Sequence, residues 1–106
     1  MDLSELSGQE CDQVWFVRDY VQIWFSNLGL TCMAPPTIRI GDRTHRFPEP
    51  GSRDALCLSI GCRVDSATVD ARDRVEVRFT NGALLTVERD PEHPDWEIWD
   101  LVKRSW

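Results

Sequence analysis

The stretch RDRVEVRFTN at residues 72–81 decides the fold, because it repeats RDYVQIWFSN at residues 18–27. Five of the ten aligned positions are identical, and three more pair Glu with Gln, Val with Ile and Thr with Ser. Upstream, G-x-x-C-x-x-V at 8–14 matches G-x-x-V-x-x-A at 61–67, but there the spacing is 53 residues instead of 54, so one residue has slipped between the two blocks. A repeat of this kind predicts one supersecondary unit used twice to close a shared core.

Length and charge limit the classes of protein to which this chain can belong. At 106 residues it has room for one domain, which we expect to span 1–106, with internal repeats at about 6–40 and 59–101. Residues 88–100 hold six acids against one arginine, and a net charge of −6 argues against the basic footprint that nucleic acids require. The sequence has no apolar run long enough to cross a membrane and no signal-peptide pattern at its acidic N-terminus. We therefore expect a cytoplasmic protein that binds neither nucleic acid nor membrane.

The cysteines, histidines and acids predict no catalytic or metal site. In a cytoplasmic protein the four cysteines are expected to be reduced thiols. A zinc site built on Cys57 and Cys62 with the two histidines lacks a recognised ligand spacing. The sequence contains no glycine-rich phosphate loop, no G-x-S-x-G and no H-E-x-x-H. We expect no metal, no cofactor and no enzymatic activity; the remaining enzymatic hypothesis is general acid–base catalysis by Asp90 and Glu92.

The second repeat predicts an antiparallel meander with a defined register. A three-residue loop at 71–73 pairs Val69 with Val75, and a three-residue loop at 80–82 pairs Val77 with Leu85. The second loop needs Gly82 in the left-handed conformation. A two-residue turn would instead set polar residues opposite the buried valines, so the buried face favours the longer loop. We expect the first repeat to form the same unit from about residue 11 to 33.

The segments outside the repeats predict a few further elements. We expect a short strand at 37–40, a surface loop at 41–52, a helix from Ser52 to Ile60 and a last strand at 96–101. Ser52 is the expected N-cap of the helix, and Leu56 and Ile60 form its expected buried edge. The predicted fold class is α+β and mostly antiparallel β, with two related β-meander repeats and one short helix between them.

The two repeats differ most on the face that should point away from the core. On that face the second repeat carries Thr68, Asp70, Arg74, Glu76 and Arg78. At the same spacing the first repeat carries Val14, Phe16, Tyr20, Gln22 and Trp24. A charged face has thus become an aromatic one. Either another part of the chain covers it, or it is a binding surface, since aromatic residues beside charges are enriched in protein interfaces.

The C-terminal segment combines aromatic and acidic residues in a similar way. Trp96 and Ile98 fall on one face of the expected strand, and Trp99 and Leu101 on the other. Acids beside an aromatic anchor favour a basic protein partner, although solubility alone also accounts for an acidic patch. The residues that we predict to bind a partner are Phe16, Tyr20, Trp24, Asp90, Glu92, Asp95, Glu97 and Trp99.

The pattern V-x-V-x-F-T-N-G-x-x-L-x-V at 75–87, preceded by G-x-x-V-x-x-A-x-V at 61–69 and followed by W-E-I-W at 96–99, resembles a family of short uncharacterised bacterial proteins, mainly actinobacterial. That family shows a duplicated hydrophobic-x-F-x-(D/N)-G unit and a late Glu-x-Trp, and the resemblance implies a fold but no catalytic residues. In size, acidity and lack of motifs the chain also resembles the immunity proteins of bacterial toxin systems.

These resemblances lead to two functional hypotheses. The first is a non-enzymatic, cytoplasmic immunity protein that binds and neutralises a cognate basic toxin domain. The alternative is a small accessory or regulatory protein-binding module that forms a homodimer through the aromatic face of the first repeat.

Overall fold

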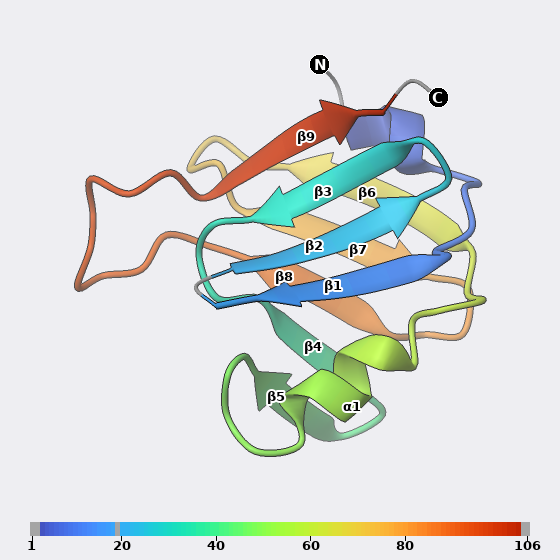
Figure 1. Ribbon diagram of the computed structural model, residues 1–106, viewed down its shortest axis with the longest axis horizontal. Coiled ribbons are helices and arrows are strands. Elements are labelled where there is room, and N and C mark those ends of the chain that lie inside the picture. Colours follow the sequence, from blue (N-terminus) through green and yellow to red (C-terminus); the bar gives the residue numbers. More distant parts are fainter. Residues whose placement is uncertain (1–2, 19, 105–106) are drawn as a thin grey trace.

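The computed structural model, which describes residues 3–18 and 20–104, is built around two antiparallel sheets (Figure 1). In spatial order, the first sheet contains β1 (Gln13–Val17), β2 (Tyr20–Phe25), β3 (Leu28–Cys32) and β9 (Trp99–Lys103). The second contains β5 (Arg43–Arg46), β4 (Thr37–Ile40), β8 (Leu84–Val87), β7 (Val75–Phe79) and β6 (Val64–Val69). Helix α1 (Ser52–Cys57) contacts β1, β4 and β5, and the 3₁₀-helix η1 (Leu3–Leu6) contacts β6. The fold is α+β and mostly antiparallel β, as the sequence predicts.

Each meander receives its fourth strand from the other half of the chain. Strands β1, β2 and β3 form the first meander, and β9, which follows the second meander in sequence, pairs with β3. Strands β6, β7 and β8 form the second meander, and β4, which follows the first, pairs with β8. Both sheets are therefore built from both halves of the chain, as the blue-to-red colouring of Figure 1 shows.

The motifs that begin the two repeats pair with each other. The Gly8 N–H donates to the Val64 carbonyl over 2.8 Å, and the Gly61 N–H donates to the Cys11 carbonyl over 2.7 Å. In the sequence match with 53-residue spacing, Gly8 is equivalent to Gly61 and Cys11 to Val64. Each of the two hydrogen bonds is therefore the counterpart of the other. The repeat is therefore an approximate two-fold symmetry of the structure, with the antiparallel bridge between Glu10 and Arg63 at its centre.

The second repeat has the register that its sequence predicts. Val69 pairs with Val75 and Val77 pairs with Leu85, so the valines lie on one face. The loop at 80–82 is closed by the N–H of Phe79, which donates to the carbonyl of residue 83 over 2.9 Å. Gly82 has φ 91°, the left-handed conformation that this loop requires.

The first repeat differs from the second by one residue at the β1–β2 connection, and this corrects our prediction of its outer face. Val17 pairs with Tyr20, so two residues join the strands instead of three. A shift of one residue turns every side chain of a strand to the opposite face. Val14 and Phe16 therefore lie opposite Ile23 and Val21 on the core side, and the expectation that they share a face with Tyr20 is wrong. The slip in the sequence match is the cause.

The hydrophobic core lies between the sheets and includes residues from both. Val21 and Phe25 on β2, and Val75 and Phe79 on β7, are almost completely removed from solvent. The rings of Phe25 and Phe79 stack, with centroids 6.4 Å apart. Each such side chain contributes about 1.5–3 kcal/mol of burial free energy, so the alternating apolar positions of the repeats supply the main stabilisation.

Three predicted elements differ in extent from those observed. The expected loop at 41–52 contains strand β5, because Ile40 pairs with Arg43 and the chain turns back along β4. The last strand runs from Trp99 to Lys103 instead of 96–101, since Pro94 and the turn before Trp96 delay its start.

Helix α1 is shorter than predicted and ends at Cys57 instead of Ile60. Its N-cap is Gly51, with φ 87°, and Ser52 is the first helical residue and makes no side-chain cap hydrogen bond. Leu56 is buried, as predicted, but Ile60 is 47% exposed because residues 58–61 form turns instead of a further helical turn.

Candidate functional site

An open apolar groove, with a volume of about 560 Å³, lies where several connections between strands converge. Tyr20 begins β2, and the other lining residues come from the segments after β1, β3 and β5 and before β4 and β9. We call it the Trp96 groove; its lining residues are Arg18, Tyr20, Met33, Pro35, Phe47, Pro48, Trp96 and Glu97. Only the first and last carry a charge.

The lining of this groove is mainly apolar, from a buried wall to an exposed rim. Phe47 forms a buried part of the wall, with 5% of its surface exposed, and its ring stacks against Phe16 at a centroid distance of 6.0 Å. Trp96 lies at the rim and is 54% exposed. A concave apolar surface with a few charges at its edge is typical of a site that binds a ligand or a protein segment.

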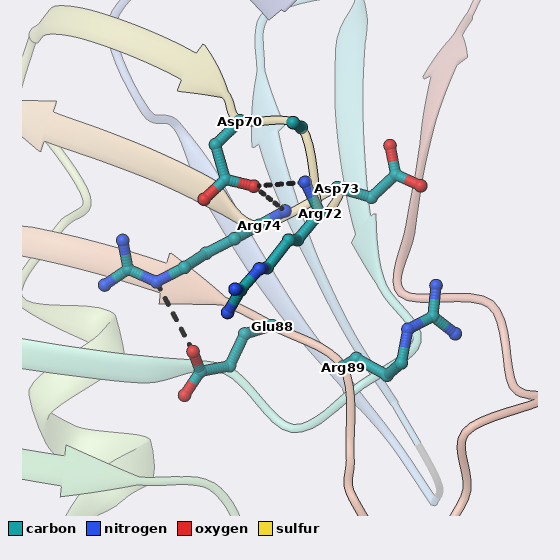
Figure 2. A pocket seen from close by; sticks show the side chains of 7 residues that line it. Asp70, Arg72, Asp73, Arg74, Glu88 and Arg89 are labelled. Atoms are coloured by element: carbon teal, nitrogen blue, oxygen red, sulfur yellow. Dashed lines mark hydrogen bonds and ion pairs between the residues drawn. The ribbon is translucent and has the colours of Figure 1, made fainter.

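The symmetry-related position in the second repeat holds charges in place of apolar side chains. The paired residues Val75 and Val87 of the second repeat are equivalent to Val21 and Cys32 of the first. Arg74, just before Val75, is therefore equivalent to Tyr20, and Glu88, just after Val87, is equivalent to Met33. In the second repeat, Nε of Arg74 lies 3.3 Å from Oε2 of Glu88 (Figure 2). In the first repeat this ion pair is replaced by Tyr20 and Met33.

Arg74 and Glu88 line a charged pocket of about 480 Å³ in the second repeat, where several charged side chains have partners within the chain (Figure 2). Asp70 accepts hydrogen bonds from the backbone N–H groups of Arg74 and Arg72, and these bonds lower the pKa of its carboxyl (Figure 2). The side chain of Arg74 also donates to Glu76 over 2.7 Å, which raises the pKa of the guanidinium. Internal pairing of this kind explains the charged pocket without a ligand. Among the described residues, no side chain covers the apolar surface of the Trp96 groove in the way that the ion pair fills the charged pocket. We therefore take the Trp96 groove as the candidate binding site.

The loop between β8 and β9 holds Trp96 in place through its own hydrogen bonds. The indole of Trp96 stacks on His93, with centroids 3.7 Å apart and planes 4° from parallel, and the backbone N–H of Trp96 donates to the His93 carbonyl over 3.1 Å. Asp90 accepts the Glu92 N–H over 3.0 Å, and Arg89 donates to the carbonyl of Pro94. A preorganised loop loses less conformational freedom on binding, which favours affinity.

The predicted partner-binding residues fall into three groups. Tyr20 and Glu97 line the groove, and Asp95 and Trp99 line the cavity next to it. Asp90 and Glu92 lie further along the β8–β9 loop, where they are part of its hydrogen bonding. Phe16 backs the groove through its contact with the Phe47 ring, and Trp24 lies elsewhere.

Trp24 belongs to the outer face of the first sheet, where it is only 3% exposed. The ring of Trp15 packs against it at 5.4 Å, and the guanidinium of Arg104 lies 4.5 Å from its centroid. The exposed apolar residues of this face are Trp15, Val17 and Val102, which present 36%, 37% and 36% of their surface. Part of the aromatic face is thus covered from within the chain, and part is exposed.

Six groove residues were not predicted as binding residues from the sequence: Arg18, Met33, Pro35, Phe47, Pro48 and Trp96. Most lie in connections, where no periodic pattern reveals orientation. Met33 and Glu88 are equivalent only through the observed strand pairing, because they are 55 residues apart and neither sequence match aligns them.

Two of the four free thiols are buried, and the described residues contain no cluster of metal ligands. Burial raises the pKa of Cys11 and of Cys32 from 9.0 to about 12, so both thiols are protonated near neutral pH and poor nucleophiles. Within 3–18 and 20–104, no three His, Cys, Asp or Glu side chains are grouped so that they could hold a metal ion.

Comparisons of the chain with protein-family models, with curated proteins and with solved structures give no match. None of the helices in the described part of the chain has the length and apolarity needed to cross a bilayer.

Proposed function

We propose that this protein is a non-enzymatic binding protein that takes a segment of a basic protein partner into the Trp96 groove. One observation carries the proposal: the groove is apolar and open at a position where the other repeat has an internal ion pair. Burying such a surface on a partner gains about 25 cal/mol per Å² of apolar area, and a half-exposed tryptophan at the rim is a favourable anchor.

The charge around the groove supports a basic partner. Asp95 and Glu97 flank Trp96, and residues 88–100 hold six acids against one arginine. Acidic residues at the edge of an interface accelerate association with a basic protein, whereas they slow association with acidic ones.

The specific form that we propose is a cytoplasmic immunity protein that neutralises a cognate bacterial toxin by covering its active site. A toxin that acts on nucleic acid must carry a basic footprint of its own, and the acidic β8–β9 loop is complementary to such a surface. Small size and a preorganised loop also suit a protein whose task is tight binding without chemistry.

The test is capture of the partner from native lysate by three forms of the tagged protein: wild type, Trp96→Ala and Trp15→Ala. The two tryptophans are both exposed but lie on different surfaces, so Trp15→Ala is the matched control. We expect one basic protein to be captured by wild type and by Trp15→Ala but not by Trp96→Ala. That protein should inhibit growth when expressed alone and become harmless when this chain is co-expressed. Equal capture by all three forms would argue against the groove, and a harmless partner would argue against the immunity role.

A second candidate function rests on the outer face of the first sheet. Trp15, Val17 and Val102 expose apolar surface on β1 and β9, which favours a homodimeric accessory module. Sedimentation equilibrium of wild type and Trp15→Glu tests this second candidate function, because a dimer formed through this face should dissociate into monomers in the variant.

A further inference from the structure

We infer that the Trp96 groove is one half of a two-part site, and that the partner segment carries a large apolar side chain next to an arginine or lysine. The inference rests on the proposed function and specifies the chemistry of the segment that the groove takes.

The second half of the site is a cavity of about 400 Å³ that shares Trp96 and Glu97 with the groove. Its lining residues are Asp73, Arg89, Asp95, Trp96, Glu97, Ile98 and Trp99. Because Trp96 and Glu97 line both, the apolar groove and the second cavity adjoin at these two residues. A peptide that passes over them therefore contacts both spaces.

The second cavity is acidic and aromatic, which makes it complementary to a cation. Asp73, Asp95 and Glu97 contribute three carboxylates, and the guanidinium of Arg89 donates to the carbonyl of Pro94. Trp96 and Trp99 supply aromatic rings, whose faces attract a cationic side chain. Arginine fits this combination better than lysine, because its planar group stacks on a ring while it donates to a carboxylate.

The groove itself fixes the order of the two side chains. Its wall of Met33, Pro35 and Phe47 accepts an apolar side chain. The two charged residues of this half, Arg18 and Glu97, balance, whereas the second cavity has three carboxylates against the single guanidinium of Arg89. Charge complementarity therefore places the apolar side chain in the Trp96 groove and the basic one beside Asp95 and Glu97.

The experiment selects short random peptides displayed on phage against the full-length protein, after depletion on Trp96→Ala. Affinities of the selected peptides are measured by fluorescence polarisation. We expect a shared pattern of one large apolar residue adjacent to arginine or lysine. Changing the basic residue to glutamine should weaken binding to wild type about tenfold. The same change should weaken binding less than about twofold on the Asp95→Asn, Glu97→Gln double variant, because its carboxylates are already gone.

A matched variant separates local recognition from general charge. Asp42→Asn removes an exposed acid at the turn between β4 and β5, away from the groove, and should keep the full dependence on the basic residue. Peptides that require Trp96 but tolerate glutamine would overturn the two-part site and leave the proposed function intact. Selection of peptides that bind Trp96→Ala equally, or of none above that background, would overturn both.

Discussion

Replacing Gly29 with alanine should destabilise the protein, because Gly29 on β3 lies directly opposite Trp24 on β2. A Cβ atom at this position would lie 2.7 Å from Cη2 of the indole and 2.8 Å from Cζ2 and Cζ3. Favourable carbon contacts are about 3.5–4.0 Å, so the ring or the strand would have to move by roughly 0.7 Å or more. The ring is 3% exposed and is held by Trp15 and Arg104, which limits such movement.

The expected loss follows from two opposing effects. Overpacking a rigid site costs about 1–3 kcal/mol. Replacing glycine by alanine within a strand recovers about 0.5–1 kcal/mol of backbone entropy. Because three ring atoms are involved, we place the overpacking at the upper part of its range and expect a net loss of about 1–2 kcal/mol in the free energy of unfolding.

Urea unfolding followed by far-UV circular dichroism measures this loss without relying on tryptophan fluorescence. The same substitution in a Trp24→Leu background is the control, since the clashing ring atoms are then absent. There Gly29→Ala should be neutral or stabilising by up to about 1 kcal/mol, so the two sites should couple by about 1–3 kcal/mol. If Gly29→Ala matches wild type, or costs the same in both backgrounds, Trp24 does not lie over Gly29 and the register of the first sheet is wrong.

Three further predictions address the turn, the buried thiols and the acidic loop. Gly82→Ala should cost about 1–2 kcal/mol in urea unfolding, because φ is 91° while the space around a Cβ is open, so strain alone acts. Burial raises the pKa of Cys32 to about 12 in the folded protein, so its contribution to stability is complete below pH 9.0 and is lost as pH rises toward 12; between these values the free energy of unfolding should fall more steeply with pH in wild type than in Cys32→Ala. Neutralising Asp90, Glu92 and Asp95 together should lower the rate at which the captured basic partner associates with the protein in surface plasmon resonance. Added salt should abolish the difference in rate between this variant and wild type.

The register of the second repeat could be predicted from sequence because several signals agree. Val69, Val75 and Val77 reach one face only with three-residue loops, and Gly82 stands where a left-handed residue is needed. The strand at 37–40 and the fold class follow from the same alternation and punctuation.

The outer face of the first repeat was predicted incorrectly because the 54-residue alignment was extended across the slip. The 53-residue match upstream places Val14 with Ala67 and Phe16 with Val69, which are core-facing pairs in the structure. Counted between equivalent residues, the connection between β1 and β2 is one residue shorter than the connection between β6 and β7, and this difference reverses which side chains of β1 face the core.

The groove could not be assembled from sequence, because the exchange of fourth strands creates it. Trp96 reaches Tyr20 and Met33 only because β9 crosses to the first sheet, and no local pattern specifies this crossing. Phe47 and Pro48 arrive through β5, in a segment whose Gly and Pro content predicts a loop. The sequence did place tryptophan beside acids, and this part of the expected site is retained in the structure.

The most direct test of the account is the affinity of the captured partner for Trp96→Ala relative to Trp15→Ala. Trp15 packs on Trp24 and Trp96 stacks on His93, so urea unfolding first establishes that both variants are folded under the binding conditions. We expect Trp96→Ala to weaken binding by about 2 kcal/mol or more, roughly 30-fold, mainly through faster dissociation, and Trp15→Ala by about twofold at most. Unchanged affinity of Trp96→Ala, or a larger loss for Trp15→Ala, would show that the partner does not use the Trp96 groove.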